Sequence, residues 1–380
     1  MINNSNDLIW IEVLKTNLIH NLKTFQKLVG NSTILAPCIK GNAYGHGLLP
    51  IAHLFIRHGA TILCINSIEE AIRLRNSGIK ASLLLLGYTQ ESNLREILKY
   101  RIIPLIYDVG TAISLSQISK KTKELVKVHI MIDTGMSREG ILPKNILKSL
   151  ALISSLPGIK IEGIATHFAT AVNGPNDRYF KMQFDIFQKL KQKIKINPQN
   201  NFMFHANNSA AIITNPKSNY DLVRPGISLF GYYSNEIVEK ECMRKKIFLK
   251  PALMLKTKIA QIKTIPKGSC VNYGCAYITP KITNIAIIPI GYADGLDKRL
   301  SNIGKVIING QIATIRGKIC MGMIVADITD IPNAKVEDEV VIVGQQGKAE
   351  ITLSDIVDNI DSSKGEFLTN LRESIKRYYI

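Results

Sequence analysis

The sequence predicts an α/β protein with an N-terminal (β/α)8 barrel followed by a mostly β C-terminal domain. Three observations carry this prediction. Eight short apolar runs alternate with amphipathic stretches over about 200 residues from Thr33 onward, as in a closed barrel of parallel strands. Near residue 235 this alternation stops and strand signals dominate. The length of 380 residues suits two domains, or one large barrel with an appendage.

The strand candidates of the barrel are mostly apolar runs bounded by polar or helical stretches. In chain order they are Thr33–Ile39, Thr61–Ile65, Ser82–Leu86, Ile102–Ile106, Val126–Ile132, Ile159–Thr166, Phe202–Ala206 and Val223–Phe230. The stretch Phe180–Ile196 predicts an amphipathic helix, because its apolar residues recur at steps of three and four positions. These residues are Phe180, Phe184, Phe187 and Leu190.

An open doubly wound sheet is the main alternative to the barrel. Such a sheet normally carries a glycine-rich phosphate turn directly after its first strand. Here the corresponding segment, residues 40–45, reads Lys-Gly-Asn-Ala-Tyr-Gly and does not match G-x-G-x-x-G. The barrel is therefore favoured.

The C-terminal third contains short strand candidates separated by turn residues. They are Ala252–Ile265, Asn284–Ile290, Lys305–Ile308, Ile312–Ile315, Ile324–Ile328 and Glu339–Val343. Asn309-Gly310 lies between two of these runs and predicts a hairpin turn. The charged segment Glu236–Lys246 is expected to be a linker. The predicted organisation has three parts: a strand in residues 1–12 that packs with the C-terminal domain, the barrel in 13–240 and the β-rich domain in 241–380.

The charge balance raises the question of an acidic partner. The chain has 48 Lys and Arg against 30 Asp and Glu, a formal net charge of +18, which is typical of proteins that bind nucleic acid. However, the basic residues are scattered, and neither zinc-finger spacing nor an aromatic-basic signature occurs. No apolar run reaches the ~18 residues of a membrane span, and the polar N-terminus shows no signal peptide. We therefore expect a cytoplasmic protein with no nucleic-acid, membrane or metal partner.

Six cysteines occur, at positions 38, 64, 242, 270, 275 and 320. None forms a C-x-x-C pair, and several lie within apolar runs. In a chain of this size without a secretion signal, the pattern predicts reduced thiols and no disulfide framework.

The residues that could carry chemistry lie at predicted strand ends, where the loops of a (β/α)8 barrel gather. Lys40 directly follows the first strand, and three glycines, a tyrosine and a histidine lie within the next seven positions. A lysine amine in such a place suits Schiff-base chemistry with a carbonyl compound. The alternative is a structural lysine that extends to solvent, and the dense glycine pattern argues against it.

Other strand ends carry polar residues as well. Ser209 can cap the helix that follows it and so present backbone N–H groups to a phosphate, although a plain cap is the alternative. Arg224 supplies fixed donors, and Gly226 lets the backbone approach a ligand closely. His167 follows another strand, where a buried structural histidine is the ordinary interpretation.

Six segments of the chain form a recognisable set in a fixed order: Lys40–Gly47, Ile132–Arg138, Arg224–Gly226, Val271–Gly274, Gly291–Gly295 and Gly317–Met321. Together they resemble the alanine racemases, which are pyridoxal-phosphate enzymes of the fold-type III class. The similarity extends over nearly the whole chain, from Trp10-Ile11-Glu12 to Lys376-Arg377.

The resemblance implies that the chain interconverts L- and D-alanine with pyridoxal 5'-phosphate and supplies D-alanine for peptidoglycan. Lys40 would hold the cofactor covalently and act as the base on one face of the substrate Cα. Tyr273, reaching from a second subunit, would be the acid/base on the opposite face, since racemisation returns the proton to the face it did not leave. A head-to-tail homodimer follows, in which the domain of residues 241–380 supplies Tyr273.

The resemblance also implies which residues hold the cofactor. The set is Lys40, Tyr44, His167, Asn208, Ser209, Arg224 and Gly226. Tyr44, Ser209 and the Gly226 backbone would bind the phosphate. Arg224, supported by His167, would hydrogen-bond the pyridine nitrogen, and its permanent charge would disfavour protonation of the ring.

On the substrate side, Arg138 and the backbone N–H of Met321 would orient the carboxylate, and Tyr292 would line the mouth of the pocket. Two departures from the family pattern concern this region. Met131 stands where many members have a lysine that positions the arginine at 138, and a thioether cannot make that charge-assisted contact. Gly322 stands where the family has an aspartate. The C-terminal motif is altered as well.

Other functions fit parts of the sequence. Gly322 enlarges the expected pocket, so a racemase of broader specificity, acting on serine or larger side chains, is the first alternative. A D-amino-acid aldolase, lyase or decarboxylase of the same fold type would leave Tyr273 without a role. A non-catalytic cofactor-binding barrel would not need the β-rich domain. Nucleic-acid binding rests on the charge alone.

Overall fold

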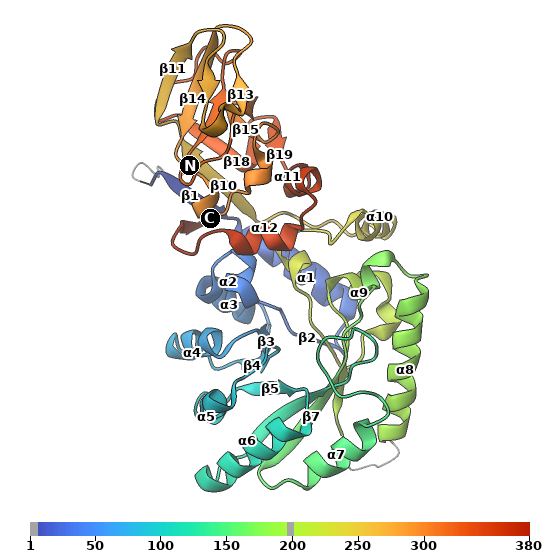
Figure 1. The fold of residues 1–380 in the computed structure, drawn as a ribbon. Helices are drawn as coiled ribbons and strands as arrows, with labels where there is room; N and C mark the ends of the chain where they lie inside the picture. Colours follow the sequence, from blue (N-terminus) through green and yellow to red (C-terminus); the bar gives the residue numbers. More distant parts are fainter. Residues whose placement is uncertain (1–6, 196–200) are drawn as a thin grey trace. The chain divides into compact units, whose positions relative to one another are not determined.

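The structure, a computed structural model, describes residues 7–195 and 201–380 (Figure 1). Two compact units make up this part of the chain. The barrel unit comprises residues 17–43 and 48–251, of which 196–200 are not described. The C-terminal unit comprises residues 1–16, of which 7–16 are described, with 44–47 and 252–380. No helix within the described ranges is long and apolar enough to cross a membrane.

Eight parallel strands form the barrel, in the order β2-β9-β8-β7-β6-β5-β4-β3. They are β2 (Ile34–Leu35), β3 (Ile62–Ile65), β4 (Ser82–Leu85), β5 (Ile103–Ile106), β6 (Val126–Met131), β7 (Ile159–Ala165), β8 (Met203–His205) and β9 (Leu222–Val223). Cys38 and Cys64 form a parallel bridge between the chain segments that continue β2 and β3, so the barrel is nearly closed. The predicted (β/α)8 architecture is confirmed.

Helices connect these strands and lie around them (Figure 1). They are α1 (Lys15–Val29), α3 (Leu48–Arg57), α4 (Ile68–Asn76), α5 (Leu94–Lys99), α6 (Val109–Thr122), α7 (Ile146–Ser155), α8 (Arg178–Lys195), α9 (Ser209–Thr214) and α10 (Glu236–Arg244). In α8, Phe180, Phe187 and Leu190 are buried along one face, which confirms the helix predicted there. The last residue of that prediction, Ile196, lies outside the described residues.

The predicted strand Val223–Phe230 was wrong beyond its first residue. Strand β9 ends at Val223, and Ile227–Phe230 form a 3-10 helix, η4. Pro225 explains the end of the strand, because it has no backbone N–H to donate to a neighbouring strand.

The predicted linker Glu236–Lys246 was wrong as well, since most of it is helix α10. Asn235 caps this helix by accepting a hydrogen bond from the N–H of Val238 at 2.9 Å. Val238 and Cys242, four residues apart, are buried on one side of the helix. Three of the charged residues that suggested a linker, Glu236, Lys240 and Arg244, are exposed to solvent, whereas Glu241 is buried and pairs with Arg244 at 2.7 Å.

The C-terminal unit is built on a ten-stranded sheet, in the order β11-β14-β17-β16-β15-β18-β10-β1-β20 with β19 beside β18. The strands are β1 (Ile9–Val13), β10 (Leu253–Lys258), β11 (Gln261–Ile265), β14 (Thr283–Ile288), β15 (Lys305–Ile308), β16 (Gln311–Ile315), β17 (Ile324–Asp327), β18 (Glu339–Gln346), β19 (Ala349–Ile351) and β20 (Lys376–Tyr379). This confirms the predicted mostly β domain. The stretch predicted as one strand, Ala252–Ile265, is two strands.

The N-terminal strand β1 belongs to this sheet, where it pairs with β10 in antiparallel and with β20 in parallel orientation. The predicted hairpin turn is confirmed between β15 and β16, with φ of 50° at Asn309 and 74° at Gly310.

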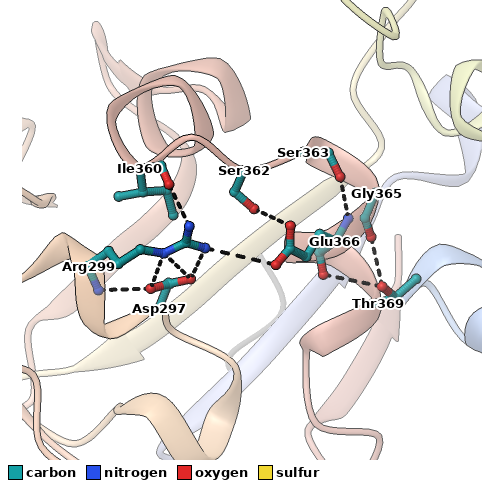
Figure 2. Close-up of polar contacts among 8 residues, drawn as sticks. All are labelled: Asp297, Arg299, Ile360, Ser362, Ser363, Gly365, Glu366 and Thr369. Atoms are coloured by element: carbon teal, nitrogen blue, oxygen red, sulfur yellow. Dashed lines mark hydrogen bonds and ion pairs between the residues drawn. The ribbon is translucent and has the colours of Figure 1, made fainter.

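Polar contacts tie the short helices of the C-terminal unit together (Figure 2). Arg299 pairs with Asp297 at 2.7 Å and donates to the carbonyl oxygen of Ile360 at 2.6 Å. Ser363 caps helix α12 (Lys364–Asn370) by accepting from the N–H of Glu366 at 3.0 Å. These contacts anchor α12, which in turn contacts a loop described below.

Candidate functional site

Lys40 begins an unusual turn at the C-terminal end of the first barrel strand. In the segment α2 (Lys40–Tyr44), Gly41, Asn42 and Ala43 have φ of 64°, 53° and 53°. This left-handed conformation is unfavourable by about 1–2 kcal/mol for each residue other than glycine. Strained backbone of this kind clusters at functional sites. Lys40 is half-buried, and no described residue forms a hydrogen bond or ion pair with its amino group.

Arg224, directly after β9, is 4 % exposed. Its Nη2 donates to the carbonyl oxygens of Thr166 at 2.8 Å and Ala206 at 3.2 Å, and its Nη1 donates to Nδ1 of His205. Burial lowers the pKa of this guanidinium. No described residue accepts a hydrogen bond from its Nε. One N–H of a nearly buried arginine is therefore left for an acceptor from outside the chain.

Two histidines extend the hydrogen bonding away from Arg224. Because arginine only donates, Nδ1 of His205 accepts, and the proton of His205 lies on Nε2. That Nε2 lies 2.8 Å from Nδ1 of His129 and donates to it. A Cβ on Gly163 would lie 2.5 Å from the same His129 nitrogen, so only glycine fits there. Burial and the charge of Arg224 lower the pKa of His129 to about 3 and lower that of His205 well below its usual value.

His167 lies on the other side of the guanidinium. Its Nδ1 is 3.4 Å from Nη2 of Arg224, and its Nε2 is 3.4 Å from Nδ2 of Asn208. Burial and the positive charges of Arg224, Arg138 and Lys40 lower its pKa to about 3. Three cations thus act on one imidazole, so the structure brings Lys40, Arg138, His167 and Arg224 to the same end of the barrel.

Because the pKa values of His129 and His167 are lowered in the folded protein, we expect acid to destabilise it. In the folded protein His129 and His167 each have a pKa of about 3, against an ordinary ~6.5, so the unfolded chain binds more protons below pH 6.5. Their contribution to the free energy of unfolding is constant above about pH 7. It falls below that by up to about 1.4 kcal/mol per pH unit for each histidine, until the pH approaches 3.

Urea unfolding at about pH 7.5, 6 and 5 measures this slope. In the His129→Gln protein, the decrease in the free energy of unfolding with falling pH should be smaller by about the contribution of one histidine. An unchanged slope in that variant would contradict the assignment of His129 as a neutral buried group.

The expectation that Ser209 caps helix α9 was wrong. Asn208 is the cap, and its Oδ1 accepts from the N–H of Ala211 at 3.0 Å. The hydroxyl oxygen of Ser209 instead accepts from the N–H of Gly226 at 2.8 Å. No described residue accepts a hydrogen bond from the Ser209 hydroxyl, so its proton is available to an anion beside Gly226.

Arg138 lies in the loop after β6, where its side chain is 54 % exposed and pairs with Glu139. Met131, in place of the lysine expected from the family pattern, is 3 % exposed and packs with Leu105 and Ala165 in an apolar cluster. Arg138 is therefore oriented by a neighbouring carboxylate in the chain and not by residue 131.

Tyr44 belongs to the C-terminal unit, together with the glycines that follow it. Nε of Arg377 donates to the carbonyl oxygen of Gly45 at 2.9 Å. A Cβ on Gly45 would lie 2.1 Å from the carbonyl oxygen of Leu368 in α12, so this position requires glycine. Strand β20 and helix α12 thus fix the loop that carries Tyr44.

Tyr273, Tyr292 and Met321 lie in three connected loops of the C-terminal unit. Asn272 donates to the carbonyl oxygen of Lys318 at 2.9 Å, and the N–H of Tyr292 donates to that of Cys320 at 3.1 Å. The three side chains are 75 %, 40 % and 63 % exposed. The structure therefore brings these loops together at the surface of this unit. The pairing of Lys40 with Tyr273 from a second subunit stays a prediction.

The expectation of six reduced thiols was wrong for one pair. Cys270 and Cys275 form a disulfide, whereas Cys38, Cys64, Cys242 and Cys320 are free. The hairpin of β12 (Cys270–Val271) and β13 (Tyr277–Ile278) brings the two Cα atoms to 4.8 Å, within the ordinary range for a disulfide. The bond closes a small loop around Tyr273.

Sequence reasoning missed several polar residues at the barrel end, namely Glu70, His129, Thr166 and His205. Only Glu70 carries a local signal, because Ser67 and Glu70 form the S-x-x-E pattern of a helix start. The two histidines lie inside strands and belong to no motif.

Comparisons with known proteins cover both units. A family model described as "Alanine racemase, N-terminal domain" matches residues 14–234, and one described as "Alanine racemase, C-terminal domain" matches residues 252–379. An alanine racemase of Clostridium novyi is 37 % identical over 374 residues, which cover 98 % of this chain and 95 % of the relative.

Solved structures agree with these matches. An alanine racemase of Clostridium difficile 630 superimposes with a TM-score of 0.92 at 32 % identity, covering 99 % of this chain and 96 % of the other. The alanine racemase of Bacillus anthracis with bound L-Ala-P superimposes with a TM-score of 0.90 at 27 % identity, covering 98 % of this chain and 95 % of the other. The alanine racemase of Bartonella henselae with covalently bound pyridoxal phosphate superimposes with a TM-score of 0.85 at 25 % identity, covering 98 % of this chain and 100 % of the other.

Proposed function

The chain belongs to the alanine racemase family and carries its pyridoxal-phosphate-dependent activity, and from that premise we propose how its residues act: Lys40 and Tyr273 exchange the Cα proton of alanine on opposite faces. One observation carries the proposal. At the end of the barrel, Lys40 has an amino group without a described partner, on the same side as an arginine whose Nε is unsatisfied.

The donors at the barrel end fit pyridoxal phosphate. Nε of Arg224 suits the lone pair of a pyridine nitrogen, and the hydroxyl of Ser209 beside the Gly226 N–H suits a phosphate oxygen. Lys40 suits a covalent link to the aldehyde. We also propose Tyr44 as a phosphate ligand, as the family pattern implies. When bound, the cofactor supplies an electron-withdrawing group that makes the substrate Cα–H acidic.

Arg224 tunes this site through its fixed charge. The neutral imidazoles of His205 and His129 hold the guanidinium from one side, and the Thr166 and Ala206 carbonyls hold it from another. Because the guanidinium stays protonated, it would donate to the pyridine nitrogen of a bound cofactor and would disfavour a proton on that nitrogen. The fixed positive charge of Arg224 would thereby limit the electron-withdrawing power of the bound cofactor.

Racemisation then needs one proton-transfer group on each face. Nζ of Lys40 removes or returns the proton on one face, and the phenolic oxygen of Tyr273 does so on the other. The 75 % exposure of Tyr273 on its own subunit supports a role in a neighbouring site, and with it a head-to-tail homodimer. Arg138 and the backbone N–H of Met321 orient the substrate carboxylate, and Tyr292 lines the mouth of the pocket.

The purified protein with added pyridoxal phosphate tests the proposed function. We expect D-alanine from L-alanine, and the reverse, with an absorbance band of a lysine-bound cofactor. No chiral conversion of alanine in either direction would overturn the proposal.

Gly322 favours a racemase of broader specificity as the second candidate. A Cβ built at this position meets no atom within 4 Å, so the glycine leaves open space where the family has an aspartate. Relative rates on alanine, serine and lysine decide between the two. A clear preference for alanine would dismiss the broader scope.

A further inference from the structure

Glu70 connects the turn that carries Lys40 to the next loop of the barrel. Its Oε1 accepts a hydrogen bond from the N–H of Gly41 at 2.8 Å, and its Oε2 accepts from the N–H of Asn66 at 2.8 Å. Glu70 stands in the first turn of α4, whose cap is Ser67. The carboxylate thus extends beyond its own helix and uses both oxygens on backbone donors of two different loops.

The turn held by Glu70 requires support from outside. Four consecutive residues after Lys40, Gly41 to Tyr44, have φ between 49° and 64°, and three of them are not glycine. Inside the turn, the N–H of Ala43 donates to the carbonyl oxygen of Ile39 at 2.8 Å. At its far end, Asn42 Oδ1 accepts from the N–H of Leu48 at 2.7 Å. A left-handed turn of this composition persists only when its surroundings determine it.

The Glu70 contact with Gly41 lies directly beside Lys40 in the chain. The peptide that joins Lys40 to Gly41 ends in the N–H that Glu70 accepts, so the carboxylate fixes the orientation of the Lys40 carbonyl and Cα. A hydrogen bond to an ionised acceptor is about twice as strong as one between neutral groups. Fixing Cα fixes the direction in which the side chain leaves the strand, and therefore where Nζ lies.

We propose that Glu70 is the positioning residue for Lys40, holding the left-handed turn so that Nζ is presented for the covalent link and for proton transfer. The inference rests on the proposed function of Lys40 and assigns to Glu70 no contact with substrate or cofactor. It predicts that loss of the carboxylate affects chemistry at Nζ more than binding of alanine.

Glu70→Gln tests this with nearly unchanged shape, because the amide has one oxygen acceptor where the carboxylate had two. Its NH2 group would then face a backbone N–H, so one of the two contacts is lost. We expect kcat for alanine to fall about 10- to 100-fold, as for a small misplacement of a reacting group, with KM changed less than about three-fold. Borohydride trapping of pyridoxal phosphate on Lys40, followed by peptide mapping, should be slowed by about ten-fold or more.

The matched control is Glu69→Gln, which removes a carboxylate from the same first turn of α4. Glu69 is exposed and makes no described hydrogen bond to the Lys40 turn. Its kcat and its trapping rate should stay within two-fold of the unaltered protein. Equal kcat and trapping in the two variants would overturn the role of Glu70.

A second variant tests the role of Glu70 if the Glu70→Gln protein does not fold. Glu70→Asp keeps the negative charge on a side chain that is one methylene shorter. Slower trapping of the cofactor in this variant would support the role of Glu70, and an unaltered trapping rate would overturn it. If the unaltered protein itself neither traps the cofactor on Lys40 nor racemises alanine, the proposed function is wrong. That result would be distinct from a failure of the proposed role of Glu70, which is judged by comparing the variants with an active unaltered protein.

Discussion

The Lys40→Ala protein should lose racemase activity by at least about 10³-fold and lose the near-visible absorbance of the lysine-bound cofactor. Alanine has no amine to hold the cofactor or to move the Cα proton, and a general base alone contributes about 10²–10⁴-fold. The fold should be unaffected, because no described residue forms a hydrogen bond or ion pair with the Lys40 amino group.

Chiral analysis of alanine and an absorbance spectrum measure both losses. Lys240→Ala is a matched control, since Lys240 is an exposed lysine paired with Glu236 on α10. It should retain activity and absorbance. Retention of either property by Lys40→Ala would refute the role of Lys40.

The Tyr273→Phe protein should keep the lysine-bound absorbance and lose racemase activity by about 10²–10⁴-fold. The phenyl ring keeps the shape of the loop, while the proton-transfer group on one face is removed. Exchange of the Cα proton should survive for the enantiomer whose proton faces Lys40, because that step does not need Tyr273.

Tyr277→Phe is the control for this variant, because Tyr277 lies in the same hairpin, where its ring contacts Arg316. It should racemise alanine at close to the normal rate. Equal rates for the two variants, or a normal rate for Tyr273→Phe, would show that Tyr273 is not the second acid/base.

The barrel could be predicted because each strand is a short apolar run and the helices between them have a clear period. The hairpin at Asn309-Gly310 was predictable for a local reason, since both residues adopt positive φ. Predictions were wrong where local pattern and tertiary context disagree. Helix α10 is rich in charged residues, which favours a linker from the local pattern, whereas its burial rests on Val238, Glu241 and Cys242 and depends on tertiary packing.

The site was predictable only where a motif marks it. Lys40 and Arg224 stand at strand ends within distinctive sequences, and the structure places both at the same end of the barrel. His129 and His205 act through contacts between distant parts of the chain, which no local pattern encodes. The S-x-x-E pattern at Ser67 and Glu70 marks a helix start, but it does not reveal the contact of Glu70 with Gly41. The Cys270–Cys275 disulfide follows from the hairpin that joins the two residues, so composition and compartment arguments could not reveal it.

The opposite-face mechanism can be tested in one measurement: the deuterium content at Cα after brief reaction of ordinary L-alanine in D2O. If Lys40 and Tyr273 act on opposite faces, the D-alanine formed carries deuterium from the second group, while the remaining L-alanine is largely unlabelled. Unlabelled D-alanine, or equal labelling of both enantiomers, would show that a single group moves the proton between faces and would contradict the account.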